Sequence, residues 1–199
     1  EMEVMGSIDD LRKKSAPQKN TYLLMRHGEA FSNIKNICSS KGEGQQLPVK
    51  GRSQVEVAAR KLKDKGIDMI VSSPIPRAKE TADMLGKMLG VAVETDARLS
   101  EVNVGTFDGM PTKNYHAYFS SFIEKFSKRA PEGEHLGDLR GRVMNWMQEM
   151  EKMHEGKKIL VVSHEYPLWM MYGGAQGLTN NQTVGLRAGK RKNDFIALA

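Results

Sequence analysis

Short apolar runs of strand length alternate with longer amphipathic stretches from Thr21 onward, and this alternation constrains the fold more than any other feature. Apolar runs bounded by turn-forming residues predict buried strands, whereas apolar residues at helical spacing predict helices. The predicted strands cover residues 21–25, 68–73, 91–95 and 158–163. The predicted helices cover residues 55–66, 76–90, 114–126, 139–156 and 167–177, and residues 183–186 and 195–199 are expected to form a terminal hairpin.

Strands that alternate with helices predict an α/β fold, in which a mostly parallel central sheet is covered by helices on both faces. The chain of 199 residues is long enough for one complete core and short for two. We therefore expect a single domain over residues 21–199. Residues 1–20 are expected to form a polar N-terminal extension that is either disordered or a short surface helix.

The composition argues against membrane and secreted classes. Hydrophobic residues make up 39% of the chain and charged residues 27%, as in ordinary soluble proteins. No apolar run approaches the ~20 residues that cross a bilayer, and the first twenty residues contain no apolar core of a secretory signal. The single cysteine, Cys38, excludes an internal disulfide and fits a reducing compartment. We expect a cytoplasmic protein that does not act at a membrane.

The net charge of +6 could attract phosphate esters or nucleic acid. The basic clusters are dispersed along the chain, at residues 12–14, 157–158 and 190–192. None of them is interleaved with aromatic residues, as a platform for single-stranded nucleic acid would be. No nucleic-acid partner is therefore expected, and most of the charge is interpreted as a solvated surface.

Three predicted strands deliver basic residues to their carboxyl ends, which packing of a buried strand does not require. Arg26 and His27 follow the first strand, Arg77 follows the second, and His164 follows the strand at residues 158–163. In open parallel sheets, ligands bind outside the carboxyl ends of the strands. The sequence therefore predicts a site at this edge that contains two arginines and two histidines.

Guanidinium groups and imidazoles together favour a phosphate site, because arginine matches phosphate oxygens with a planar, bidentate fork. The histidines could bind a metal, act as acid and base, or attack phosphorus directly. Adjacent guanidinium groups repel a divalent cation, so no metal is expected. No other cofactor is expected either. An imidazole with a free nitrogen could accept the phosphoryl group and later pass it to water.

Phosphoryl transfer to histidine also needs an acid, because the leaving alkoxide must take up a proton. Glu101 lies just after the strand predicted at residues 91–95 and is the preferred candidate. The competing carboxylates nearby are Asp108, Glu132 and Glu134.

Five ordered blocks resemble the signature of the histidine phosphatase superfamily, the phosphoglycerate mutase-like group. The blocks are "LLMRHGEAFSN", "VSSPIPRAKETADML", "LSEVNVGTFDGMP", "APEGEHLGDLRGRV" and "ILVVSHE". The resemblance runs from about Thr21 to Ala199, and it rests on the order and spacing of the blocks rather than on the short RHG block alone. It implies a three-layer α/β/α sandwich.

The resemblance also implies a role for each matching position. His27 would be the phosphoacceptor nucleophile and Glu101 the proton donor. Four residues would form the phosphate pocket: Arg26, Asn33, Arg77 and His164. All of them except Asn33 would also assist catalysis. Three residues near these motifs are weaker candidates for the site, namely Glu29, Ser32 and Ser73.

Two departures from the family pattern bear on the substrate. Glu165 stands where the family commonly has a small residue, and its carboxylate would repel the substrate unless it points away or meets a cationic leaving group. The stretch "LPVKG", residues 47–51, lacks the usual acidic residue at a helix start. Neither departure removes a predicted catalytic position.

The remaining histidines, His116, His135 and His154, carry no supporting motif and are interpreted as surface or supporting residues. Cys38 follows the RHG block and could approach the pocket, but an inert thiol is the preferred interpretation.

The resemblance implies a metal-independent hydrolase of the histidine acid phosphatase type, a phosphomonoesterase that acts on a small phosphorylated molecule. One alternative is a phosphoglycerate mutase, which must hold the phosphoryl group in a site closed to water. The stretch between Glu101 and Leu139 is short for a large lid, which favours hydrolysis. The other alternative is an inactive module that binds a phosphorylated ligand or a partner. The protein is expected to be a monomer or a homodimer.

Overall fold

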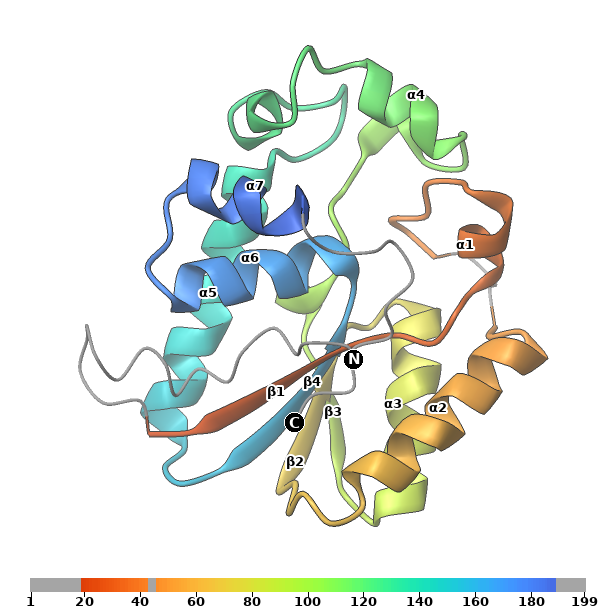
Figure 1. The fold of residues 1–199 in the computed structure, drawn as a ribbon, viewed down its shortest axis with the longest axis vertical. Helices are drawn as coiled ribbons and strands as arrows, with labels where there is room; N and C mark the ends of the chain where they lie inside the picture. The colour runs from red at the N-terminus through yellow and green to blue at the C-terminus, as the bar shows by residue number, and fades with distance from the viewer. Residues whose placement is uncertain (1–18, 43–45, 189–199) are drawn as a thin grey trace.

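The computed structural model describes residues 19–42 and 46–188 (Figure 1). Its centre is a four-stranded, all-parallel sheet with the strand order β1-β4-β2-β3. The strands are β1 (Thr21–Arg26), β2 (Met69–Ser72), β3 (Val93–Thr95) and β4 (Lys158–Ser163). This sheet confirms the predicted α/β fold and the four predicted strand positions.

Helices cover both faces of the sheet (Figure 1). The α-helices are α1 (Phe31–Lys35), α2 (Val49–Leu62), α3 (Pro76–Leu89), α4 (Thr112–Ala117), α5 (Leu136–Met153), α6 (Glu165–Ala175) and α7 (Asn180–Ala188). Short 3-10 turns are η2 (Ala97–Leu99), η3 (Gly105–Phe107) and η4 (Ile123–Phe126). Helices α2 and α3 lie on one side of the sheet and α5 and α6 on the other, which is the expected three-layer sandwich. Over the described residues, no helix has the length and apolar character needed to span a bilayer.

The register of the two neighbouring strands β1 and β4 positions the candidate site. Arg26, the last residue of β1, pairs with Ser163, the last residue of β4. The backbone N–H of His27 then donates to the Ser163 carbonyl at 3.0 Å. Because the strands are parallel and end together, His27 and His164 leave the sheet at the same edge.

Helix α5 begins about one turn earlier than its apolar pattern indicates, because His135 caps it. The Asp138 N–H donates to His135 Nδ1 at 2.9 Å, and the Asp138 carboxylate accepts from the His135 N–H at 3.2 Å. The apolar face expected from the sequence is buried, with Trp146 1% exposed. This reciprocal cap fixes where the helix starts, next to residues 130–134.

Two sequence predictions are wrong in the region after β3. Residues 183–186 lie in α7 and not in a hairpin strand, and residues 195–199 lie outside the described part of the chain. Thr179 and Gln182 cap α7 reciprocally, with N–H donors bonded to side-chain oxygens at 2.9 and 3.2 Å. Residues 114–126 are not one helix but α4 and η4 separated by a bend, so that Phe119 and Phe126 both reach the core.

The predicted N-terminal extension lies mostly outside the described residues, which begin at Lys19. Asn20 is buried and is tied to the domain: its amide donates to the His154 carbonyl at 2.9 Å and its carbonyl oxygen accepts from the Lys157 N–H at 3.0 Å. The segment that leads into β1 is therefore anchored at the end of α5.

Candidate active site

The two histidines predicted at the strand ends lie together at the carboxyl edge of the sheet. Their ring centroids are 5.1 Å apart, with His27 directly after β1 and His164 directly after β4. His27 is 4% exposed and His164 is fully buried. The strand register therefore brings into contact two residues that are far apart in the sequence.

The contacts of His27 define which of its nitrogens is free to react. Nδ1 lies 2.7 Å from the Gly28 carbonyl oxygen, which can only accept, so Nδ1 carries the proton. Nε2 then bears the lone pair, and it accepts a hydrogen bond from Arg77 Nε at 3.0 Å. Arg77 extends from the first turn of α3, and its side chain is buried rather than solvated. The pair places a potential nucleophile directly beside a guanidinium group.

Electrostatics keep the His27 imidazole neutral. Burial lowers its pKa well below the ordinary value, and the positive charges of Arg77 and Arg26 lower it further. Burial also lowers the pKa of Arg77, to about 10, so this guanidinium is still charged near neutral pH. A neutral imidazole beside a cation can act as a nucleophile toward an anionic phosphoryl group.

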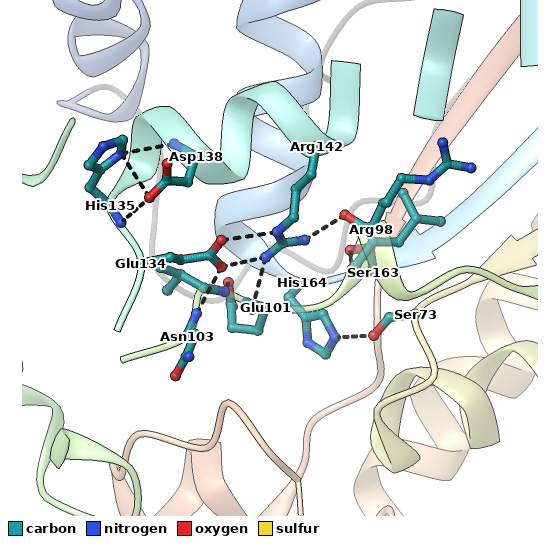
Figure 2. Close-up of polar contacts among 12 residues, drawn as sticks. Ser73, Arg98, Glu101, Asn103, Glu134, His135, Asp138, Arg142, Ser163 and His164 are labelled. Atoms are coloured by element: carbon teal, nitrogen blue, oxygen red, sulfur yellow. Dashed lines mark hydrogen bonds and ion pairs between the residues drawn. The ribbon is translucent and has the colours of Figure 1, made fainter. Parts of the chain in front are cut away.

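His164 is held by Ser73, which follows β2. His164 Nε2 lies 2.8 Å from Ser73 Oγ, and both side chains are fully buried. Figure 2 shows the two side chains directed toward each other. Burial and the charge of Arg77 lower the pKa of His164 well below its usual value. Its Nδ1 is also buried and has no hydrogen-bond partner within residues 19–42 and 46–188. Ser73, which the sequence supports only weakly, thus orients one of the two histidines.

Glu165, the residue that departs from the family pattern, faces a cation. Its carboxylate lies 3.6 Å from Arg26 Nη1, and both side chains are partly exposed. The sequence did not indicate this partner, because it raised only a carboxylate that points away or one that meets a cationic leaving group. The charge of Arg26 also acts on the two histidines that follow β1 and β4, where it contributes to lowering the pKa of both.

Glu101 is the carboxylate best suited to hold a proton. It is half-buried, and burial raises its pKa above the usual value for glutamate, while a hydrogen bond from the Val102 N–H and the charges of Arg77 and Arg26 act in the opposite direction. The two arginines that act on Glu101 are the same two that act on His27. Glu101 therefore shares the electrostatic environment of the histidines.

The competing carboxylates have other partners or surroundings. Asp108 Oδ1 accepts from the backbone N–H and the hydroxyl of Ser40, at 2.6 and 2.9 Å. Glu134 forms a bidentate pair with Arg142. Glu132 is exposed in a turn with φ of 59°. The role of Glu101 as the acid stays a prediction, and two of its three competitors are engaged in hydrogen bonds of their own.

Asn33 lies on α1 near the RHG loop, and its side-chain oxygen accepts from the Ala30 N–H at 2.9 Å. In the structure this oxygen stabilises the turn into α1. The predicted contact of Asn33 with phosphate stays a prediction.

Two glycines that the sequence did not single out hold the RHG loop in place. A Cβ on Gly28 would lie 2.6 Å from the Gly51 carbonyl oxygen, and a Cβ on Gly51 would collide with the Glu29 carbonyl. The "LPVKG" stretch thus brings the start of α2 into close contact with the loop that carries His27. Glu29 itself pairs with Lys50 at 3.0 Å on the surface.

Cys38 and Lys125 are buried near this region without an assigned role. Burial raises the pKa of Cys38 to about 11, which keeps the thiol protonated and agrees with the interpretation of an inert cysteine. Lys125 is 2% exposed, with Nζ 2.6 Å from His116 Nδ1 and 4.3 Å from the centre of the Tyr115 ring. The sequence indicated neither the burial of this lysine nor its aromatic surroundings.

No cluster of three or more histidine, cysteine, aspartate or glutamate side chains suited to a metal ion occurs among the described residues. Metal independence stays a prediction for experiment.

Comparison with known proteins identifies the sequence family. The profile of the histidine phosphatase superfamily (branch 1) matches residues 22–189. A probable phosphoglycerate mutase, GpmB, of Yersinia enterocolitica is 27% identical over 169 residues, which are 82% of this chain and 78% of the relative. An uncharacterised phosphatase, PhoE, of Bacillus subtilis is 30% identical over 146 residues, which are 71% of this chain and 69% of the relative.

Solved structures share the fold. A mycobacterial glucosyl-3-phosphoglycerate phosphatase, solved with VO3, superimposes with a TM-score of 0.73 at 23% identity, over 82% of this chain and 85% of the other. A putative alpha-ribazole-5'-P phosphatase of Escherichia coli gives a TM-score of 0.73 at 22% identity, over 82% and 83% of the two chains.

Proposed function

The chain belongs to the histidine phosphatase superfamily, and from this premise we propose that it is a phosphomonoesterase that removes phosphate from a small phosphorylated molecule through a phosphohistidine at His27. The proposal rests mainly on the protonation and the hydrogen bonds of the His27 imidazole. Its imidazole is neutral, its Nδ1 proton is bonded to Gly28, and its Nε2 lone pair is oriented toward Arg77. These are the requirements for an imidazole that attacks phosphorus beside a charge-stabilising group.

In the first step, His27 Nε2 forms a bond to phosphorus while the bond from phosphorus to the leaving oxygen breaks. Arg77 exchanges its hydrogen bond to Nε2 for bonds to the phosphoryl oxygens, where charge must be neutralised during transfer. Arg26 and His164 contact the same oxygens. Glu101 donates its proton to the leaving oxygen, so that the alcohol departs neutral.

In the second step, water hydrolyses the phosphohistidine. The Glu101 carboxylate accepts a proton from the attacking water, the new oxygen–phosphorus bond forms, and the nitrogen–phosphorus bond to His27 breaks. Inorganic phosphate leaves, Glu101 is protonated again, and His27 returns to its neutral form. No step requires a metal ion or an organic cofactor.

A phosphoglycerate mutase is the second candidate, because several relatives carry the name probable phosphoglycerate mutase. Both activities use the same phosphohistidine, and they differ in whether the phosphoryl group passes to water or back to an organic acceptor. Incubation with a phosphoglycerate separates them: a phosphatase releases inorganic phosphate, whereas a mutase produces the isomer. An inactive binding module is disfavoured because all five proposed catalytic positions carry reactive or charge-stabilising side chains.

The remaining features of the proposal are a small phosphorylated molecule as the substrate and a cytoplasmic monomer or homodimer that binds neither nucleic acid nor membrane. We also propose that the enzyme is of the acid-phosphatase type and works at acidic pH. His27 has a lowered pKa, so its imidazole stays neutral at pH values where an ordinary histidine is protonated.

We expect the protein to release phosphate from a generic aryl phosphate, and to retain this activity after extensive dialysis against EDTA. The arginines and histidines supply the charge stabilisation that a metal supplies in other phosphatases. Phosphate release before and after dialysis measures the result. Loss of activity that Mg²⁺ or Zn²⁺ restores would indicate a metal-dependent phosphatase instead.

Replacing Arg77 with alanine is expected to weaken vanadate binding by about 2–4 kcal/mol, the scale for losing one preorganised donor to an anion. Lysine at this position should recover only part of the loss, because it lacks the bidentate fork. Titration calorimetry with vanadate measures the effect, and Arg26→Ala is expected to behave in the same way. Unchanged affinity would place the substituted arginine outside the phosphate pocket.

A further inference from the structure

The loop that carries Glu101 is held from one side by a single arginine of α5. Arg142 Nη2 donates to the Glu101 carbonyl oxygen at 3.1 Å, and Arg142 Nη1 donates to the Arg98 carbonyl oxygen at 2.5 Å. Both acceptors are backbone oxygens of the segment just before and at the proposed acid (Figure 2). The contacts from Arg142 fix the backbone of Glu101 and do not involve its carboxyl group.

The same guanidinium is fixed by Glu134. Arg142 Nε and Nη2 donate to the two Glu134 carboxylate oxygens at 3.1 and 2.6 Å. Glu134 Oε1 also accepts from the Asn103 N–H, and the Glu134 N–H donates to the Asn103 carbonyl, both at 2.9 Å. The ion pair therefore contacts the loop on both sides of Glu101, at residues 98 and 103.

Further contacts stop this loop from moving away from the sheet. Ser163, the last residue of β4, donates through its buried hydroxyl to the Leu99 carbonyl at 2.6 Å. A Cβ on Gly133 would lie 2.7 Å from the Asn103 carbonyl oxygen, so the two turns pack backbone against backbone. The loop is thus attached to α5, to β4 and to the turn before α5.

Only arginine can make these contacts at once. Its planar fork carries five N–H donors, and here they reach one carboxylate and two carbonyl oxygens in different directions. Lysine would keep the charge but could not span all three acceptors. Arg142 and Glu134 are mostly buried, at 22% and 18% side-chain exposure, which shields the pair from competing water.

We propose that Arg142, held by Glu134, is a positioning residue for the reaction: it fixes the loop at residues 98–103 so that the Glu101 carboxyl group meets the leaving oxygen. This inference rests on the proposed function, in which Glu101 is the acid. A displacement of about 1 Å in a reacting group can slow catalysis ~10²-fold, so a clamp on the backbone of the acid has measurable consequences.

Arg142→Met is expected to slow hydrolysis of an alkyl phosphate about 10- to 100-fold through kcat, with little change in KM. A nitrophenyl phosphate, whose leaving group needs little protonation, should be slowed less than about threefold. Arg142→Lys tests whether the planar guanidinium is needed. It keeps the positive charge, and it should still slow the alkyl phosphate much more than the nitrophenyl phosphate. Thermal unfolding of both variants verifies that the domain remains folded.

Arg129→Met is the matched control. Arg129 forms a bidentate pair with Asp138 at 2.9 and 3.0 Å, which resembles the Arg142–Glu134 pair but lies on the surface, where its carboxylate partner belongs to the first turn of α5. This variant should hydrolyse both substrates at the wild-type rate. The double variant Glu101→Gln with Arg142→Met should be no slower on the alkyl phosphate than Glu101→Gln alone, because Arg142 acts through Glu101.

Several outcomes would overturn the proposal: unchanged kinetics in Arg142→Met, equal slowing of both substrates, or further slowing in the Glu101→Gln background. Amide hydrogen exchange gives a readout that does not depend on activity. Arg142→Met should speed exchange at Val102 and Asn103, and Arg129→Met should not. If the wild type hydrolyses neither phosphate, the proposed function fails, and hydrogen exchange still decides whether Arg142 fixes the loop.

Discussion

Replacing His27 with alanine is expected to reduce turnover by about four orders of magnitude or more, on the scale seen when a catalytic nucleophile is removed. The physical reason is that the reaction forms a bond to His27 Nε2. His164 cannot substitute for it, since the Nε2 of His164 is engaged with the Ser73 hydroxyl at 2.8 Å. The fold should persist, because His27 contributes contacts at the edge of the sheet rather than within its core.

Brief incubation of the wild type with labelled substrate should place acid-labile phosphate on His27, and the label should be absent from His27→Ala. His154→Ala is a suitable control, because His154 lies at the end of α5, remote from the carboxyl ends of β1 and β4. Near-normal turnover in His27→Ala, or label on another residue, would contradict the phosphohistidine mechanism.

The Glu101→Gln variant is expected to hydrolyse an alkyl phosphate about 10²–10⁴-fold more slowly than the wild type, the usual contribution of general acid catalysis. Glutamine has nearly the same shape but cannot donate the required proton. A nitrophenyl phosphate should be affected much less, because its leaving group departs readily as an anion. Steady-state rates with the two substrates measure the difference.

The same assignment predicts the pH dependence. An acid must be protonated to donate, so hydrolysis of the alkyl phosphate should fall as pH rises through the Glu101 pKa, which burial has raised. His27 has a lowered pKa and stays neutral at pH values where an ordinary histidine would be charged, so activity should extend to acidic pH. The decline at high pH should disappear in Glu101→Gln.

Equal slowing of both substrates, or a decline at high pH that survives in Glu101→Gln, would assign Glu101 a structural role. Glu165 would then be the first alternative to test, because it lies beside Arg26 at the start of α6. Glu132 and Glu134 would follow, although Glu134 is already bound to Arg142.

Local patterns predicted most of the fold. The strands are short, apolar runs that become buried, and parallel strands separated by helices have few arrangements available. The exceptions lie where local patterns conflict with packing. Residues 183–186 are β-prone in isolation, yet the reciprocal cap of Thr179 and Gln182 starts a helix there, a signal that the sequence contains. Residues 114–126 bend because their aromatic side chains reach the core at two separate places.

The sequence by itself determined which chemical groups the site could contain, because His27 and His164 each follow a strand and parallel strands end at one edge. Only the tertiary structure decided what those groups contact. It decided the tautomer of His27, which follows from the contact of Nδ1 with the Gly28 carbonyl. It also brought together residues from different elements: His27 bonds to Arg77, Glu165 pairs with Arg26, and Arg142 bonds to the backbone of Glu101. Such contacts depend on how side chains from separate helices and strands converge in space, and neither periodicity nor motif spacing contains that information.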